Sequence, residues 1–207
     1  MNRKLLLSIA AVLIIGVSLP LGAYLYLRSQ VAAKPSWLRS GMFMTYEQFF
    51  VWTGHNQTEN MTWNVVGLRD DFVDVHLVSH GADATGENVA ITLGEENWTI
   101  NVFTREIVDS LESAYVGKKV PFWIENSTRI GSRIDSFYGV SVVKQSQVIS
   151  VLGQQRDCWV VEYDWTTATM TRWYDKSSGI VLKIHVVLHQ NTTVDITETA
   201  ISTNIDL

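Results

Sequence analysis

The sequence predicts a mainly β domain, a curved antiparallel sheet or partial barrel with one short helix, preceded by one N-terminal transmembrane helix. Three observations indicate this. Apolar and polar residues alternate through much of the chain after residue 41, turn-forming segments separate the alternating stretches, and the uncharged stretch Leu5–Leu27 precedes them. Alternation with a period of two is typical of strands that bury one face, and short turns favour antiparallel pairing.

The stretch Leu5–Leu27 is long enough to cross a membrane as a helix. At 1.5 Å per residue it measures about 34 Å, against about 30 Å for the hydrocarbon core of a bilayer. Arg3 and Lys4 precede it, which favours a cytoplasmic N-terminus. The alternative is a signal peptide cleaved after Ala33, although the apolar region of such peptides is usually shorter, about 7–15 residues.

Both alternatives place the rest of the chain outside the cytoplasm, in the cell envelope. The predicted parts are a cytoplasmic stub (1–4), a transmembrane helix (5–27), a juxtamembrane linker (28–40) and an extracytoplasmic β-rich domain (41–207).

The composition is that of a packed domain with an acidic surface. Hydrophobic residues make up 46% of the chain, and all eight Trp lie beyond residue 35. Residues 35–207 contain 12 Lys and Arg against 21 Asp and Glu, a net charge of −9, which argues against nucleic acid as a partner. Cys158 is the only cysteine, so no intramolecular disulfide forms. Because it opens an apolar run, we expect it in the core.

Five Asn residues begin Asn-x-Ser/Thr triplets and are candidate glycosylation sites, which supports the outside placement. They are Asn56, Asn60, Asn97, Asn126 and Asn191. Four of them lie in polar, turn-like stretches, where a glycan is exposed. Asn97 is the weaker candidate because it opens a predicted strand. The alternative is that Asn, Ser and Thr are simply common in turns.

Twelve strands and one helix are predicted in the domain. The strands are expected near 42–52, 62–68, 72–79, 88–93, 97–104, 120–125, 137–143, 146–152, 157–165, 168–175, 179–189 and 193–203. The stretch Arg105–Tyr115 carries apolar residues at helical spacing and is the expected helix. In the segment 182–189, Ile184 and Val186 fall on an apolar face and Lys183 and His185 on a polar one, which predicts a sheet with one side on a core.

Neither histidine pair predicts a metal site. His76 and His80 are four residues apart, as are His185 and His189. On a strand that spacing covers about 13 Å, too far for two ligands to share one ion. The two pairs would meet only if their strands were neighbours in matched register.

No other motif predicts a metal, a cofactor or a catalytic group. The acidic residues Asp70, Asp71 and Asp74 and the loop 83–88 lack the ligand repeat of a calcium loop. The domain is therefore expected to be non-enzymatic, with no cofactor.

Aromatic residues recur through the predicted strands. Most are expected to fill the core, but some have the character of a groove for a lipid, a glycan or a protein segment. Trp123, Trp159 and Trp173 are the candidate groove residues, with Trp159 and Trp173 expected to face each other across a hairpin.

The segment Gly153–Lys183 carries a recurring pattern, with Cys158-Trp159-Val160-Val161 followed by Trp173-Tyr174-Asp175-Lys176 and Gly179. This pattern resembles uncharacterised, membrane-anchored surface proteins of archaea and, more remotely, the lipoprotein-carrier-like half-barrels of bacterial envelopes. The resemblance covers about a quarter of the chain. It implies a turn joining two long strands of a curved antiparallel sheet, and no binding residue can be carried over from it.

Three functions fit these observations. The first is a membrane-anchored binding module outside the cytoplasm that holds a lipid or hydrophobic segment. The second is a structural or adhesion-type surface protein whose partner is another envelope protein. The third is an extracytoplasmic hydrolase whose site has no recognisable motif.

Overall fold

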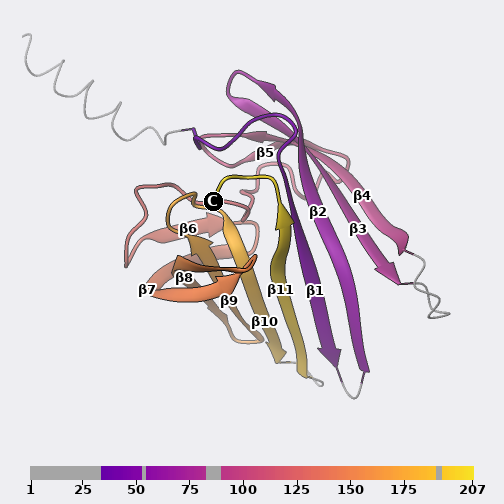
Figure 1. Ribbon diagram of the computed structural model, residues 1–207, viewed down its shortest axis with the longest axis vertical. Helices are drawn as coiled ribbons and strands as arrows, with labels where there is room; N and C mark the ends of the chain where they lie inside the picture. Colours follow the sequence, from indigo (N-terminus) through magenta and orange to yellow (C-terminus); the bar gives the residue numbers. More distant parts are fainter. Residues whose placement is uncertain (1–33, 53–54, 83–89, 190–192) are drawn as a thin grey trace, which may run out of the picture. The chain divides into compact units, whose positions relative to one another are not determined.

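The computed structural model describes residues 34–52, 55–82, 90–189 and 193–207, which form eleven strands (Figure 1). The strands are β1 (Phe43–Trp52), β2 (His55–Arg69), β3 (Phe72–Ala82), β4 (Ala90–Asn101), β5 (Ile107–Ser110), β6 (Arg133–Ser136), β7 (Gly139–Val151), β8 (Gln154–Trp165), β9 (Ala168–Asp175), β10 (Val181–His189) and β11 (Thr193–Thr203).

All eleven strands belong to one open, curved, antiparallel sheet, as the alternation predicted. Their order is β5-β4-β3-β2-β1-β11-β10-β9-β8-β7-β6. The first and last strands therefore pair in the middle of the sheet. The two edges are β5 and β6, four residues each and consecutive in the chain. A sheet with that order lacks only one pairing, between β5 and β6, to be closed.

The connection between the two edge strands, residues 111–132, crosses the open side of the sheet. Its backbone bonds to the β5 side through Ile107 and to the turn after β6 through Phe137. It also reaches the opposite part of the sheet, where the Val181 N–H donates to the Phe122 carbonyl over 2.9 Å. The connection thus covers the inner face of the sheet at one end.

Aromatic rings from the connection and the N-terminal segment fill this covered end. The Phe122 ring lies between the rings of Trp63 and Trp98, stacked at centroid distances of 5.6 and 5.8 Å. Trp123 packs edge-on against Trp37 at 6.0 Å. Trp37 and the adjacent Leu38, from the segment predicted to be a linker, are both buried.

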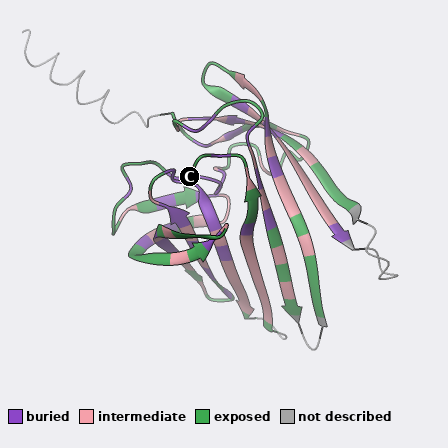
Figure 2. Cartoon of the chain, in the orientation of Figure 1, coloured by how far each residue is buried: buried purple, intermediate pink, exposed green. Residues whose placement is uncertain are grey.

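Burial differs between the two ends of the long strands. Figure 2 shows the buried residues gathered where the connection and the N-terminal segment lie, whereas the far parts of β1, β2 and β4 are mostly exposed or half-buried. At that far end both faces of the sheet meet solvent. The inner face is therefore covered at one end and open at the other.

The helix predicted at Arg105–Tyr115 is wrong, and the described part of the chain contains no helix. Arg105 has a positive φ of 63°, which interrupts a helical run at its first residue. Ile107 then enters the edge strand β5 and is fully buried, while Leu111, on the proposed apolar face, is 81% exposed. A helix here would bury too little apolar surface to form.

The strand predicted at 120–125 is also wrong. This segment is a buried, irregular part of the connection that makes one isolated bridge, between Trp123 and Ile180. Every residue from Val120 to Ile124 is buried, so it has no exposed alternate face, and Pro121 has no N–H for a ladder.

Several predicted strand boundaries differ from the structure. Where two strands were predicted at 88–93 and 97–104, the structure has the single strand β4 (Ala90–Asn101), and where two were predicted at 137–143 and 146–152 it has β7 (Gly139–Val151). Strand β2 begins at His55, earlier than predicted. The sequence pattern missed its first part because that part is polar on both faces. The remaining predicted strands are present, and the two edge strands β5 and β6 were missed.

No helix among the described residues is long and apolar enough to cross a membrane. The predicted transmembrane helix Leu5–Leu27 and the cleavage position after Ala33 lie outside the residues that the structure describes.

Two glycines with similar backbone conformations test how tightly the connection packs on the β9–β10 turn. Gly179 (φ +77°) lies so close to the connection that an added Cβ would be 2.4 Å from the Ile124 carbonyl oxygen, whereas Gly153 (φ +71°) has open space around it. We expect Gly153→Ala to lower the free energy of unfolding by about 1–2 kcal/mol, the cost of a left-handed conformation. Gly179→Ala should cost clearly more, on the order of 3 kcal/mol. Urea unfolding of the full chain, followed by Trp fluorescence, measures both. Equal losses would contradict the close packing.

Candidate functional site

The inner face of the sheet and its covering segments enclose an apolar cavity of about 110 Å³, which we call the inner-face cavity. Strands β1, β2, β3, β4, β10 and β11 form one wall, and the connection and the β6–β7 turn form the other. The lining residues are Tyr46, Gln48, Met61, Leu77, Trp98, Pro121, Phe122, Phe137, Tyr138, Val181, Ile184 and Glu198.

One carboxyl group lies in this apolar wall. Glu198 in β11 is half-buried and pairs in register with Gln48 of β1 on one side and with Ile184 of β10 on the other. The Gln48 amide Nε2 donates to Glu198 Oε1 over 2.9 Å. Among the described residues, no group hydrogen-bonds the second oxygen, Oε2. Desolvation raises the pKa of Glu198, and the hydrogen bond from Gln48 only partly opposes it.

Two phenols border the carboxyl group and stay neutral. The Tyr46 hydroxyl donates to the Val181 carbonyl over 2.8 Å, and the Trp63 indole N–H donates to the Tyr46 oxygen over 3.4 Å. Burial raises the pKa values of both Tyr46 and Tyr138, and the nearby Glu198 carboxylate adds to both shifts. Glu198 is therefore the one carboxyl group that the described residues contribute to the cavity wall, and it lies beside two phenols that burial keeps neutral.

Apolar side chains continue along the inner face beyond the cavity, toward the open end of the sheet. Phe50 and Ile196 are opposite each other on β1 and β11, and Val186 is opposite Ile196 on β10. All three are half-buried, as is Leu188 further along β10. Because they share a face with Gln48, Glu198 and Ile184, an apolar surface adjoins the cavity.

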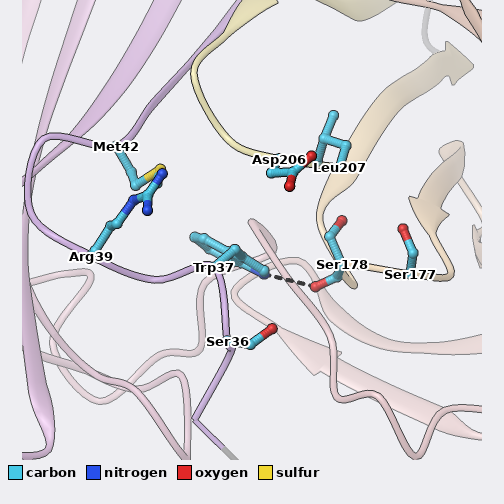
Figure 3. A pocket seen from close by; sticks show the side chains of 8 residues that line it. All are labelled: Ser36, Trp37, Arg39, Met42, Ser177, Ser178, Asp206 and Leu207. Carbon is cyan, nitrogen blue, oxygen red and sulfur yellow. Dashed lines mark hydrogen bonds between the residues drawn. The ribbon is translucent and has the colours of Figure 1, made fainter.

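A larger cleft lies at the covered end, between the N-terminal segment, the β9–β10 turn and the last residues of the chain (Figure 3). It has a volume of about 410 Å³, and its lining is mainly polar. The one hydrogen bond drawn in it joins Trp37 Nε1 to the Ser178 carbonyl over 2.8 Å and ties the two sides together. The cleft is wide and open, and it offers neither an apolar interior nor a buried charge. The inner-face cavity is therefore the better candidate site.

The predicted groove aromatics do not line the inner-face cavity. Trp123 is buried against Trp37 in the core. Trp159 pairs with Tyr174, and Trp173 pairs with Val160. Since adjacent residues of a strand point to opposite faces, Trp159 and Trp173 lie on opposite faces of the sheet, and the prediction that they face each other is wrong.

Each of these two half-buried tryptophans contacts a lysine. The Lys176 ammonium lies 4.3 Å from the Trp159 ring centroid, and the Lys183 ammonium lies 5.4 Å from that of Trp173. The lysines thus cover part of each ring, which fits a packing role for both.

The glycosylation candidates within the described residues are all exposed. Asn56, Asn60 and Asn97 lie in strands rather than in turns, on the face of the sheet opposite the cavity. Asn126 lies in the connection, and Asn191 lies outside the described residues. Their exposure is compatible with modification, which stays a prediction.

The two histidine pairs lie on β3 and β10, which are separated by β2, β1 and β11. His76 bonds to Glu95 and His185 to Asp195, each over 2.9 Å. Across the parts of the chain that the structure describes, no three His, Cys, Asp or Glu side chains are close enough to hold a metal ion.

Cys158 is fully buried, as predicted, and burial raises the pKa of its thiol to about 12. A thiol with that pKa stays protonated at neutral pH and is a poor nucleophile.

Gln48 and Glu198 were missed as site residues, although the sequence carries a signal for both. Each lies at one of the alternate positions of its strand that are otherwise apolar. Glu198 shares its face with Val194 and Ile196, and Gln48 shares its face with Tyr46 and Phe50. A polar residue among alternate apolar ones marks a position where a strand buries a polar group.

The raised pKa of Glu198 predicts a pH-dependent effect of Glu198→Gln on stability. Because the carboxyl holds its proton more tightly in the folded state, its favourable contribution is complete at low pH and is lost as pH rises through the folded-state pKa. Glu198→Gln should therefore match the wild type near pH 4 and exceed it in Tm at pH 8, with each kcal/mol worth roughly 2–4 °C. Glu47→Gln, at an exposed site on the same strand as Gln48, is the control and should shift Tm little. A Tm difference for Glu198→Gln that is constant across pH would contradict the burial of this carboxyl.

Comparison with known proteins finds no matching family model and no matching curated sequence. Partial likenesses exist to solved structures. An exported protein with a YmcC-like fold from Bacteroides fragilis is 11% identical, with 84% of this chain and 99% of that chain covered and a TM-score of 0.47. A lipoprotein from Parabacteroides distasonis is 9% identical, with 80% and 96% covered and a TM-score of 0.41.

The lipoprotein YmcC from Escherichia coli is 10% identical, with 76% of this chain and 87% of that chain covered and a TM-score of 0.31. Proteins described as exported or as lipoproteins are of the kind that the more remote sequence resemblance named, whereas the archaeal resemblance finds no support among them. TM-scores below 0.5 make this a partial likeness in strand arrangement, from which neither a family nor a function follows for this chain.

Proposed function

We propose that the domain is a non-catalytic binding module, anchored in the cell membrane by Leu5–Leu27 and located outside the cytoplasm, that holds the apolar part of a lipid-like molecule in the inner-face cavity. The observation that carries the proposal is the cavity itself: an apolar space of about 110 Å³ between a sheet and a separate covering segment. The sequons and the charge bias at the N-terminus support the outside placement.

The size of the cavity limits what enters it. An apolar cavity of ~150 Å³ can bind a benzene-sized molecule. A volume of about 110 Å³ therefore suits the end of an acyl chain or a small ring, not a whole lipid. The rest of such a ligand would lie on the half-buried apolar residues that follow along the inner face, Phe50, Val186 and Ile196.

The covering segment gives the cavity a means of admitting a ligand. Phe122 and Tyr138 belong to the connection and to the β6–β7 turn, and both line the cavity from the side opposite the strands. The connection is bonded to β10 through Phe122 and Val181, whereas the β6–β7 turn has no regular secondary structure, so a small displacement of Tyr138 enlarges the cavity without breaking a strand ladder.

Photo-crosslinking of the full chain in membranes tests the proposal. A dodecanol analogue with a diazirine at the end of its tail is added, and labelled peptides are mapped by mass spectrometry. We expect label on peptides that carry the cavity residues, in addition to label on the anchor.

Two matched variants decide whether the label reflects the cavity. Leu77 lines the cavity, whereas the next residue, Val78, points to the other face of β3. Leu77→Trp should reduce cavity labelling about tenfold by filling the space, and Val78→Trp should leave it unchanged. Far-ultraviolet circular dichroism confirms that both variants are folded. Equal labelling in the two variants, or label confined to the anchor, would exclude the cavity as a ligand site.

A further inference from the structure

We infer that the inner-face cavity prefers a ligand whose apolar tail is attached to a cationic amine, and that Glu198 is the residue that recognises the amine. This rests on the proposed function and names the class of ligand that the same site takes. The inference follows from where the charges lie around the cavity.

The free oxygen of Glu198 is the first element of the geometry. Gln48 holds Oε1, and Oε2 has no partner among the described residues, although the side chain lines the cavity. Glu198 is half-buried, so a ligand in the cavity can supply a hydrogen bond to Oε2. An ammonium group donates hydrogen bonds and has no acceptor, so it complements a carboxylate oxygen.

The second element is a row of inward-facing residues that crosses the sheet at this level. Glu198 of β11 is opposite Gln48 of β1, which is opposite Glu59 of β2. A second carboxylate thus lies on the same face of the sheet, two strands from Glu198. An anionic head group placed here would be repelled by both carboxylates.

The third element is that the nearest cation in the row is not available to a ligand. On the other side of Glu198 the row continues through Ile184 of β10 to Arg172 of β9. Arg172 is fully buried, and its two terminal nitrogens donate to the hydroxyls of Ser136 and Ser141. Its guanidinium also lies 5.9 Å from the centroid of the Tyr138 ring, which separates it from the cavity.

These three elements rank the possible head groups. A carboxylate or phosphate head meets Glu198 and Glu59 without access to Arg172. A hydroxyl head gains one hydrogen bond with Glu198. An ammonium head gains a charge-assisted hydrogen bond and pairs the half-buried Glu198 carboxylate with a cation, which is the largest gain of the three.

Binding of an amine should depend on pH through Glu198. Where the carboxyl is protonated, an ammonium ligand must displace that proton to water, so affinity rises with pH until the carboxyl is ionised in the free protein. The other titratable or charged groups facing this position are Glu59 from β2, Tyr46 from β1, Tyr138 from the β6–β7 turn and Arg172 from β9. Lys183 and His185 of β10 lie on the opposite face of the sheet.

The test compares three unlabelled competitors that differ only in the head group: dodecylamine, dodecanol and dodecanoate. Each competes with the diazirine dodecanol for the cavity of the full chain, in the wild type and in Glu198→Gln. The ratio of the competitor concentrations needed in the two proteins cancels partition into the membrane. Glu47→Gln, on the outer face of the same strand as Gln48, is the control.

At pH 8 we expect Glu198→Gln to need a dodecylamine concentration at least roughly tenfold higher than the wild type needs, because the variant loses a charge-assisted hydrogen bond. The ratio of the two concentrations should be smaller at pH 5. Dodecanol should give a ratio near one, and dodecanoate a ratio below one. Equal ratios for the three head groups, or a preference of the wild type for dodecanoate, would overturn the assignment of an amine ligand while the cavity remains a lipid site. Absence of any cavity label in the wild type would instead remove the proposed function itself.

Discussion

The Arg105 guanidinium links the two edges of the sheet, β5 and β6, which do not pair with each other. Arg105 is buried and lies in the turn between β4 and β5. It donates three hydrogen bonds to backbone carbonyls: Nη1 to Val120 and Trp123 of the connection, over 3.2 and 3.1 Å, and Nη2 to Asp135 of β6, over 3.0 Å. A single side chain therefore joins the end of β4, the connection and the opposite edge strand. Desolvation lowers the pKa of Arg105, yet a guanidinium stays charged, and its planar fork suits three diverging carbonyls in a way that a lysine ammonium does not.

These three hydrogen bonds of Arg105 explain how an open sheet can enclose a cavity. In the strand order, β1 and β11 pair in the middle of the sheet, and β5 and β6 are its two unpaired edges. The connection joins these two edges and presents Phe122 between Trp63 and Trp98. The cavity lies between this aromatic stack and the strands. One of its walls is therefore formed by the sheet, and the other depends on the connection that Arg105 holds in place.

Sequence patterns predicted the parts of the fold in which one face is buried. Strands β10 and β11 were predicted nearly to the residue because their alternation is uninterrupted. The first part of β2 was missed because both faces are polar where the sheet is open to solvent. The connection was misread because a fully buried irregular segment and a buried strand have the same apolar composition, and only the tertiary contacts of Phe122 distinguish them.

The site residues were harder to predict than the strands for a related reason. Nothing in the sequence distinguishes the buried Arg105 and Arg172 from surface arginines, since their partners are carbonyls and hydroxyls far along the chain. The sequence does mark Glu198, as an acidic residue among alternate apolar ones. Its pairing with Gln48, however, spans 150 positions and follows from the register of β1 against β11. The tryptophans drew attention by their size, yet most of them fill space in the core.

Glu198 and Arg172 lie on one row of the sheet and do not pair. Ile184 stands between them in register, and the Tyr138 ring lies against the guanidinium. A direct ion pair would satisfy both groups and would leave the cavity wall without a free acceptor. Instead the two terminal nitrogens of Arg172 donate to two hydroxyls, its Nε has no partner among the described residues, and Glu198 keeps one oxygen free at the cavity. A core selected for stability alone would place an apolar residue at position 198, because a half-buried carboxyl in an apolar wall loses part of its hydration and gains only one hydrogen bond. The carboxyl at this position is therefore better explained by what enters the cavity than by what the fold requires.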